Sequence, residues 1–288
     1  MNAPTLEFRI AAPHEAERLL GAGKFTPTLA ALAARERALL VNVDGEPGAL
    51  AFFTGDELVV EIEAIVVAPA LRGGGIGKST IAFLRGPEGR SVRALLPAEG
   101  AAVAPMFAAL GGPLEVFAGY SVAVPVADRL ATELSGSASL AVRPIQIESD
   151  LRDLFELDRL AGNPCDRALH EALGTLAQGL LFARPDGEIA AYLYVFPDGE
   201  IGPGAAAGSA LLGDAILFAL SRLRGIGRDL ARVRIPLANP RLAQLLRRCG
   251  GSIVDLAVAV GEPLQGRAVR LPRCGMLRGE SAGRSSAW

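Results

Sequence analysis

The sequence predicts an α+β protein made of two similar halves. Two observations support this, and the first is a repeated β-hairpin signal. Apolar runs lead into Asp-Gly at residues 39–46 and again at residues 180–188. Asp-Gly between apolar runs favours a tight hairpin, because both turn positions tolerate positive φ.

The second observation is a longer segment that recurs without an insertion. Residues 93–112 and 232–251 each read as a strand, a loop and a helix that ends at Gly-Gly. The residue numbers differ by 139 at each of three matching pairs, which are Arg93 and Arg232, Pro97 and Pro236, and Gly111 and Gly250. Such a repeat indicates a duplication. We therefore expect a first domain at residues 1–132, a second domain at 139–279, a small polar connection between them, and a disordered tail at 280–288.

Composition narrows the class of protein. The chain has 288 residues, of which 50% are hydrophobic and 21% are charged, as in a globular protein of two domains. The 29 basic and 31 acidic side chains give a net charge of -2, which disfavours binding to nucleic acid or to an anionic membrane. Residues 1–10 do not resemble a signal peptide, and residues 205–220 are too short for a membrane span and predict a buried helix. We expect a cytoplasmic protein.

The cysteines and histidines do not suggest a metal site. Cys165, Cys249 and Cys274 are odd in number and lack a short paired spacing, so we expect reduced and mostly buried thiols. His14 and His170 have no partner at a spacing typical of a metal site or a nucleophile pair, and we expect them on helices or at the surface.

The segment 59–79 has the pattern of a phosphate-binding loop. A β-branched strand leads into a glycine-rich loop, and a helix is predicted to start near Gly75. Glycines let backbone N–H groups converge on an anion at the positive end of a helix. A nucleoside-triphosphate P-loop is an alternative, because Gly77-Lys78-Ser79 matches its end, although Arg72 occupies the position of its first glycine. A purely structural glycine turn is a second alternative.

The flanking residues resemble a different family. The run Val67-x-Pro69-x-x-Arg72-x-x-Gly75-x-Gly77 resembles the pyrophosphate signature of the GNAT N-acetyltransferase superfamily, V-x-P followed by [QR]-x-x-G-x-[GA]. The resemblance covers residues 5–125 and, more faintly, 140–279. It implies two tandem GNAT-like domains, each a mixed, mostly antiparallel sheet flanked by helices. It also implies acetyl-CoA as cosubstrate, no metal, and a cofactor site formed by Val66, Val67, Arg72, Gly73, Gly74, Gly75, Ile76, Gly77, Lys78 and Ser79.

Acetyl transfer to an amine needs a base, and something must protonate the departing thiolate. Glu61 and Glu63 lie two apart on the strand entering the loop, so they share one face, and the family often has a general-base Glu near Glu61. The alternative is that both are solvated carboxylates. The family's usual acid, a Tyr on the helix after the next strand, is replaced by Phe107, so the proton has to come from water or from another group such as Tyr120.

The second half is predicted to keep the fold without the site. Residues 200–208, the match to the loop, lack its arginine and glycine pattern, and the strand at 192–196 carries no carboxylate corresponding to Glu61 or Glu63. Leu246 occupies the family's Tyr position. We expect this half to pack against the first and to form one wall of the acceptor cleft.

The sequence therefore predicts an acetyl-CoA-dependent N-acetyltransferase that acts by direct attack in a ternary complex. The acceptor is an amine of a small molecule or peptide, and the protein is a monomer or homodimer. The alternative is a non-catalytic module that binds or senses CoA or acyl-CoA. Phe107 and the lack of a certain acid and base favour that alternative.

Overall fold

The computed structural model describes residues 4–21, 24–97, 109–111, 113–124, 140–261 and 269–271. The first half contains β1 (Leu6–Ile10), α1 (Pro13–Leu20), α2 (Pro27–Ala33), β2 (Ala38–Val43), β3 (Glu46–Gly55), β4 (Val59–Val67), the 3-10 turn η1 (Pro69–Leu71), α3 (Ile76–Arg85), β5 (Ser91–Pro97) and β6 (Pro113–Ala123). The second half contains β7 (Ala141–Pro144), α6 (Ile147–Ala161), α7 (Arg167–Leu176), β8 (Gln178–Ala183), β9 (Ile189–Val195), β10 (Glu200–Ala206), α8 (Ser209–Gly225), β11 (Leu230–Pro236), α9 (Pro240–Arg248), β12 (Ser252–Gly261) and β13 (Val269–Leu271). The predicted α+β class is confirmed.

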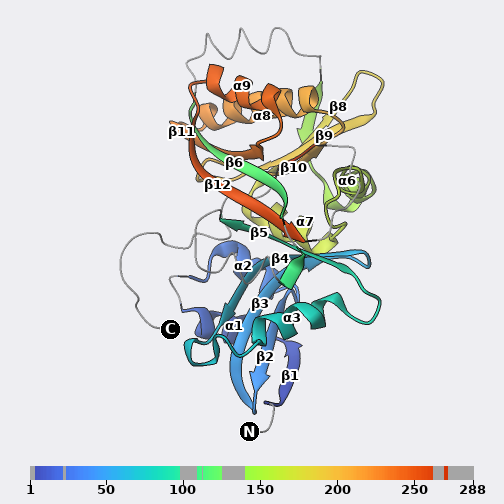
Figure 1. Ribbon diagram of the computed structural model, residues 1–288. Coiled ribbons are helices and arrows are strands. Elements are labelled where there is room, and N and C mark those ends of the chain that lie inside the picture. Colours follow the sequence, from blue (N-terminus) through green and yellow to red (C-terminus); the bar gives the residue numbers. More distant parts are fainter. Residues whose placement is uncertain are drawn as a thin grey trace.

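The strands of both halves join into one sheet that runs through the molecule (Figure 1). Within the described residues the order is β1-β2-β3-β4-β5-β12-β6-β11-β10-β9-β8-β7, and β13 pairs with β10. Neighbouring strands are antiparallel except for β4 with β5 and β10 with β11, which are parallel. The two parallel pairs occupy matching places in the two halves.

The two halves exchange two equivalent strands, β6 and β12. β12, from the second half, pairs with β5 of the first, while β6, from the first half, pairs with β11 of the second. Pro97 lies opposite Ala257, Pro236 lies opposite Phe117, and Phe117 and Ala257 lie opposite each other at the centre. The sequence did not predict this exchange. The predicted connection between residues 132 and 139 and the predicted tail at 280–288 lie outside the described residues.

Helices cover both faces of the sheet. On β3, the adjacent residues Ala51 and Phe52 point to opposite faces. Phe52 packs with Leu32 of α2, and Ala51 packs with Ile81 of α3. In the second half α8 and α9 share one core cluster, and α6 packs with β9 in another.

The local sequence signals account for several elements. Asp44 and Gly45 have φ of 52° and 87°, and this confirms the predicted hairpin between β2 and β3. Gly187, at φ 88°, lies in the equivalent turn between β8 and β9. The buried helix predicted at 205–220 is α8, which starts at Ser209 because residues 205 and 206 belong to β10. No helix in the described part of the chain is long and apolar enough to cross a membrane.

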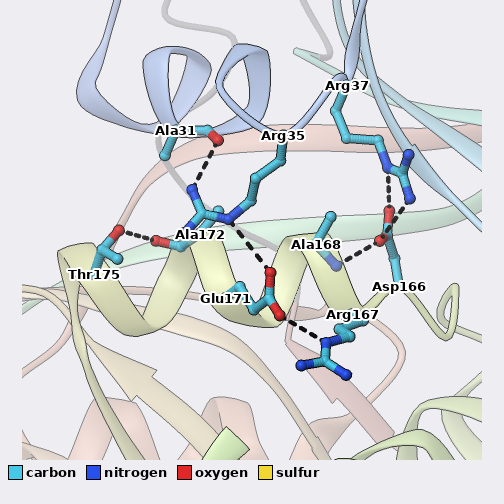
Figure 2. A network of polar contacts seen from close by, with 9 residues as sticks. All are labelled: Ala31, Arg35, Arg37, Asp166, Arg167, Ala168, Glu171, Ala172 and Thr175. Atoms are coloured by element: carbon cyan, nitrogen blue, oxygen red, sulfur yellow. Dashed lines mark hydrogen bonds and ion pairs between the residues drawn. The ribbon is translucent and has the colours of Figure 1, made fainter.

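A buried carboxylate ties the halves together. Asp166 is the N-cap of α7, and its side chain, only 1% exposed, accepts a hydrogen bond from the N–H of Ala168 at 2.9 Å. It also accepts from Nε and Nη2 of Arg37 at 2.9 and 3.1 Å (Figure 2), and from the N–H of Gly55 at 2.9 Å. One carboxylate therefore caps a helix of the second half and holds two segments of the first.

We expect Asp166→Ala to destabilise the whole chain. The change leaves the N–H groups of Gly55 and Ala168 and the guanidinium of Arg37 without their acceptor, which should lower the free energy of unfolding by about 2 to 4 kcal/mol. Urea denaturation followed by circular dichroism measures the loss. Glu156→Ala, at an exposed position of α6, is the control and should change the value by less than about 0.5 kcal/mol. A loss below about 1 kcal/mol for Asp166→Ala would contradict this role.

Candidate functional site

The glycine loop lies between β4 and α3, as predicted. The N–H of Ala68 donates to the carbonyl of Gly48 at 2.9 Å, which fixes the start of the loop to β3. Gly73 and Gly75 have φ of 81° and 82°, a conformation that side chains with a Cβ rarely adopt. Gly75 is the N-cap of α3, so the helix starts where the sequence predicted.

Most backbone N–H groups of this loop are available to a ligand. Those of Arg72 and Gly74 make long turn contacts of 3.3 Å with the carbonyls of Pro69 and Leu71. Among the described residues, no acceptor is bonded to the five other N–H groups, those of Gly73, Gly75, Ile76, Gly77 and Lys78. Residues 72–75 and Lys78 are exposed, and the helix dipole adds partial positive charge at this end. The arrangement suits a phosphate group.

Next to the loop, β4 has an unpaired edge. The parallel ladder between β4 and β5 runs from Val59 and Ser91 to Ile62 and Ala94 and then stops. β4 continues to Val67, and there it pairs with β3 on its other side. Within the described residues, no strand pairs with the β5-side edge of Val66 and Val67, although the carbonyl of Val67 accepts a hydrogen bond from Nε of Arg72. An extended molecule could pair there as a strand would.

Glu61 and Glu63 lie where the ladder ends. Phe53 pairs with Ile62 and Phe52 with Ala64, so Glu63 is the extra residue of a β-bulge. The carboxylate of Glu63 accepts a hydrogen bond from Oγ1 of Thr54 at 3.1 Å. Oε2 of Glu61 lies 3.5 Å from Nη2 of Arg93. Both carboxylates are half-buried and engaged, in contrast to the alternative of freely solvated side chains.

The structure does not bring Tyr120 to these carboxylates. Tyr120 is 1% exposed and packs in the core of the second half. It lies on β6, between β11 and β12, three strands from β4. Strands are about 4.8 Å apart, so the separation is about 14 Å. Phe107, at the family's usual acid position, lies outside the described residues.

The second half keeps the carboxylate that the sequence analysis missed. Glu200 on β10 pairs with Arg232 on β11, as Glu61 pairs with Arg93, and both members differ by 139 in number. The prediction that the second half has no carboxylate at the Glu61 position is therefore wrong. It matched β4 to β9 and the loop to β10. The constant offset of 139, applied backwards from Arg232, would have found Glu200.

What the second half lacks is the loop itself. α3 starts at Ile76 and α8 at Ser209, only 133 residues later, so six residues are missing between the strand and the helix. α8 has 17 residues where α3 has 10, and this restores the offset at the next strand. The edge of β10 is also taken, because β13 pairs with residues 204–206 on the side away from β9.

The cysteines and histidines differ in their exposure and contacts. Burial, with the nearby carboxylates of Asp158 and Asp56, raises the pKa of the Cys165 thiol to about 11, so the thiol is protonated at neutral pH. Cys249 is buried, and Cys274 lies outside the described residues. His14 is exposed on α1. His170 of α7 is buried and bonded to Asp158 at 2.8 Å and to Tyr194 at 2.9 Å. No group of three metal-binding side chains occurs in the described part of the chain.

Known structures share this architecture. A Pyrococcus horikoshii protein provisionally described as an acetyltransferase is 16% identical with a TM-score of 0.62, and the match covers 91% of each chain. A tandem GNAT protein from the clavulanic acid biosynthesis pathway is 18% identical with a TM-score of 0.50, covering 91% of this chain and 100% of the other. Saccharomyces cerevisiae N-myristoyltransferase, solved with bound myristoyl-CoA, is 11% identical with a TM-score of 0.56, covering 93% and 79%.

No family model and no curated protein matches the sequence significantly. The structural similarity, by contrast, extends over both halves of the chain. In both halves a strand, a crossover helix and a parallel strand recur in the same order. The chain therefore has the fold of the GCN5-related N-acetyltransferases, repeated in its two halves.

Proposed function

We propose that the chain is an N-acetyltransferase that uses acetyl-CoA and acts on an amine of a small molecule or peptide. One observation carries the proposal: a row of unpaired N–H groups lies beside an open strand edge. The first suits the diphosphate of a CoA ester, and the second suits its extended, amide-containing arm. The structural neighbour with bound myristoyl-CoA supports an acyl-CoA as the ligand class.

In this proposal, the N–H groups of residues 72–77 hold the diphosphate, and Lys78 and Ser79 add polar contacts at the first turn of α3. The arm pairs with Val66 and Val67 and directs the thioester towards Glu61 and Glu63. Arg72 supports the loop, because its Nε donates to the carbonyl of Val67 at 3.1 Å. This contact fixes the loop against the end of β4.

The acyl transfer needs no covalent enzyme intermediate. The neutral amine attacks the thioester carbonyl, a C–N bond forms, the C–S bond breaks, and CoA leaves as a thiolate that takes up a proton from water. Glu61 or Glu63 accepts the proton that the amine loses, directly or through a water molecule. Cys165, protonated and on the second half, is not placed to act as a nucleophile.

The second half acts as a partner of the site. It supplies β12, which pairs with β5 next to the gap between β4 and β5 beyond Ile62, called here the open slot. It also supplies α7, which packs on α2 through apolar residues, while Asp166 and Glu171 contact Arg37 and Arg35 just after α2. We infer that these elements form one wall of the acceptor cleft. A cytoplasmic location and a monomeric or homodimeric state complete the proposal.

A CoA or acyl-CoA sensor is the second candidate. The separation of Tyr120 from the two carboxylates favours a sensor, because the hydroxyl of Tyr120 is then not placed to protonate the departing thiolate. Assaying CoA release from acetyl-CoA with a panel of amines separates the two. Binding without release on any amine supports the sensor.

Gly75→Glu tests the cofactor loop. The new carboxylate stands among the unpaired N–H groups and repels a diphosphate, so acetyl-CoA binding should weaken about 100-fold, or about 2.7 kcal/mol, in calorimetric titration. Gly75→Ala introduces the same backbone strain without the charge and should lose less. Gly208→Glu, at the N-cap of α8, is the matched control in the second half and should bind as the wild type does. Equal affinity of Gly75→Glu and wild type would refute the site.

The structure also gives an expectation for stoichiometry. Only the first half has the loop, and β13 takes the matching strand edge in the second. A single acetyl-CoA should therefore bind each chain. Native mass spectrometry at saturating ligand measures the ratio, and two molecules per chain would show that the second half retains a site.

Glu61→Gln and Glu63→Gln tell the two carboxylates apart. Replacing the general base by an amide should lower kcat about 100-fold to 10,000-fold. The other variant should stay within about 10-fold of wild type. Acetyl-CoA affinity, measured in parallel, should change little in either. If both variants keep full kcat, neither carboxylate is the base.

A further inference from the structure

Arg93 is a buried arginine at the end of the β4 and β5 ladder. It is only 4% exposed. Its Nη2 lies 3.5 Å from Oε2 of Glu61 and donates to the carbonyl of Gly162 at 2.6 Å. Glu61 belongs to the first half, whereas Gly162 ends α6 in the second. One guanidinium thus connects the candidate base with the other half of the protein.

The exchanged strand fixes the same arginine from another side. Gly261 of β12 pairs with Arg93. Gly261 has φ of 134°, and a Cβ built on it would lie 2.5 Å from the carbonyl oxygen of Val92 and 2.8 Å from Cγ of Arg93. Only glycine leaves room for the Arg93 side chain at this point. Two glycines of the second half therefore fix the side chain of Arg93. Gly261 limits the space at its stem, and the carbonyl of Gly162 holds its guanidinium.

The equivalent arginine of the second half lies in different surroundings. Arg232 occupies the same place in the repeat and pairs with Glu200, but it is exposed to solvent. No glycine loop follows the strand that carries Glu200. The buried, three-sided fixation of Arg93 thus occurs in the half that has the open slot.

We propose that Arg93 is a positioning residue, through which the second half holds the carboxylate of Glu61 in place for acyl transfer. The inference rests on the proposed function and takes Glu61, one of its two candidate bases, as the group that accepts the proton of the attacking amine. A fixed ion pair restricts the rotamers of Glu61 and keeps its carboxylate at the end of the slot. This gives the second half a role in catalysis although it lacks a cofactor loop.

The test uses the full chain with three changes around this contact and one control. Arg93→Gln removes the charge, and Arg93→Lys keeps it without the planar fork that reaches both partners. Gly261→Ala alters the second half alone and pushes on the arginine stem. The control is Arg232→Gln, the same change in the other copy. Each variant is assayed for kcat and for the KM of acetyl-CoA, with the most active amine of the panel.

We expect kcat to fall about 100-fold for Arg93→Gln and about 10-fold for Arg93→Lys and Gly261→Ala. The KM for acetyl-CoA should stay within about 2-fold, because the loop at 72–77 is unchanged, and the control should match the wild type. If Arg93→Gln does not fold, Arg93→Lys and Gly261→Ala decide. Wild-type kcat in both of these, or an equal loss in the control, would overturn the proposal. A rise in KM as large as the fall in kcat would do the same, because it indicates general damage to the cofactor site.

A second measurement is independent of turnover. The carboxylate carbon of Glu61, labelled with carbon-13 and assigned by its absence in Glu61→Gln, reports the surroundings of that group by NMR. Its resonance should move in Arg93→Lys and Gly261→Ala and stay in place in Arg232→Gln. If the wild type turns over no amine, the proposed activity fails, but this NMR measurement still tests the positioning role of Arg93. An unmoved resonance overturns it.

Discussion

The pairing of β6 with β12 is the constraint on which the rest of the structure depends. Each of these strands completes the sheet of the opposite half, so β5 has its outer neighbour only when residues 252–261 are in place. β5 in turn forms the far side of the slot beside β4. The two halves are therefore joined by main-chain hydrogen bonds of one continuous sheet as well as by side-chain contacts.

A β-bulge in β4 accounts for the open strand edge of the candidate site. The bulge at Glu63 turns the last residues of β4, and the ladder to β5 ends one residue before it. The freed edge is thus a consequence of this local geometry. Both halves carry a register shift at this point, at Glu63 and between Ile201 and Gly204, so the opening belongs to the repeated fold. The two halves differ in the loop that follows this point and in β13, which pairs with the edge of β10.

Local signals were readable from the sequence, whereas long-range pairing was not. Asp44-Gly45 and the glycines before α3 require particular backbone angles, and their positions were predicted correctly because such requirements act within a few residues. The strand exchange depends on which of two similar apolar strands pairs with β5, and both satisfy the same pattern. Glu200 was missed for a related reason: the missing loop and the longer α8 compensate each other, so the sequence alignment shifted by one strand.

The second half keeps the carboxylate of the repeat but differs from the first half in the loop and in the strand edge. The segment between β10 and α8 is six residues shorter than the one between β4 and α3, so α8 begins without a glycine-rich loop in front of it. β13 then pairs with the edge of β10 that would otherwise stay open, which satisfies its main chain and removes an exposed strand edge. An open edge costs stability unless a ligand or a strand covers it. In this chain the first half leaves its edge open beside the glycine loop, and the second half closes its own.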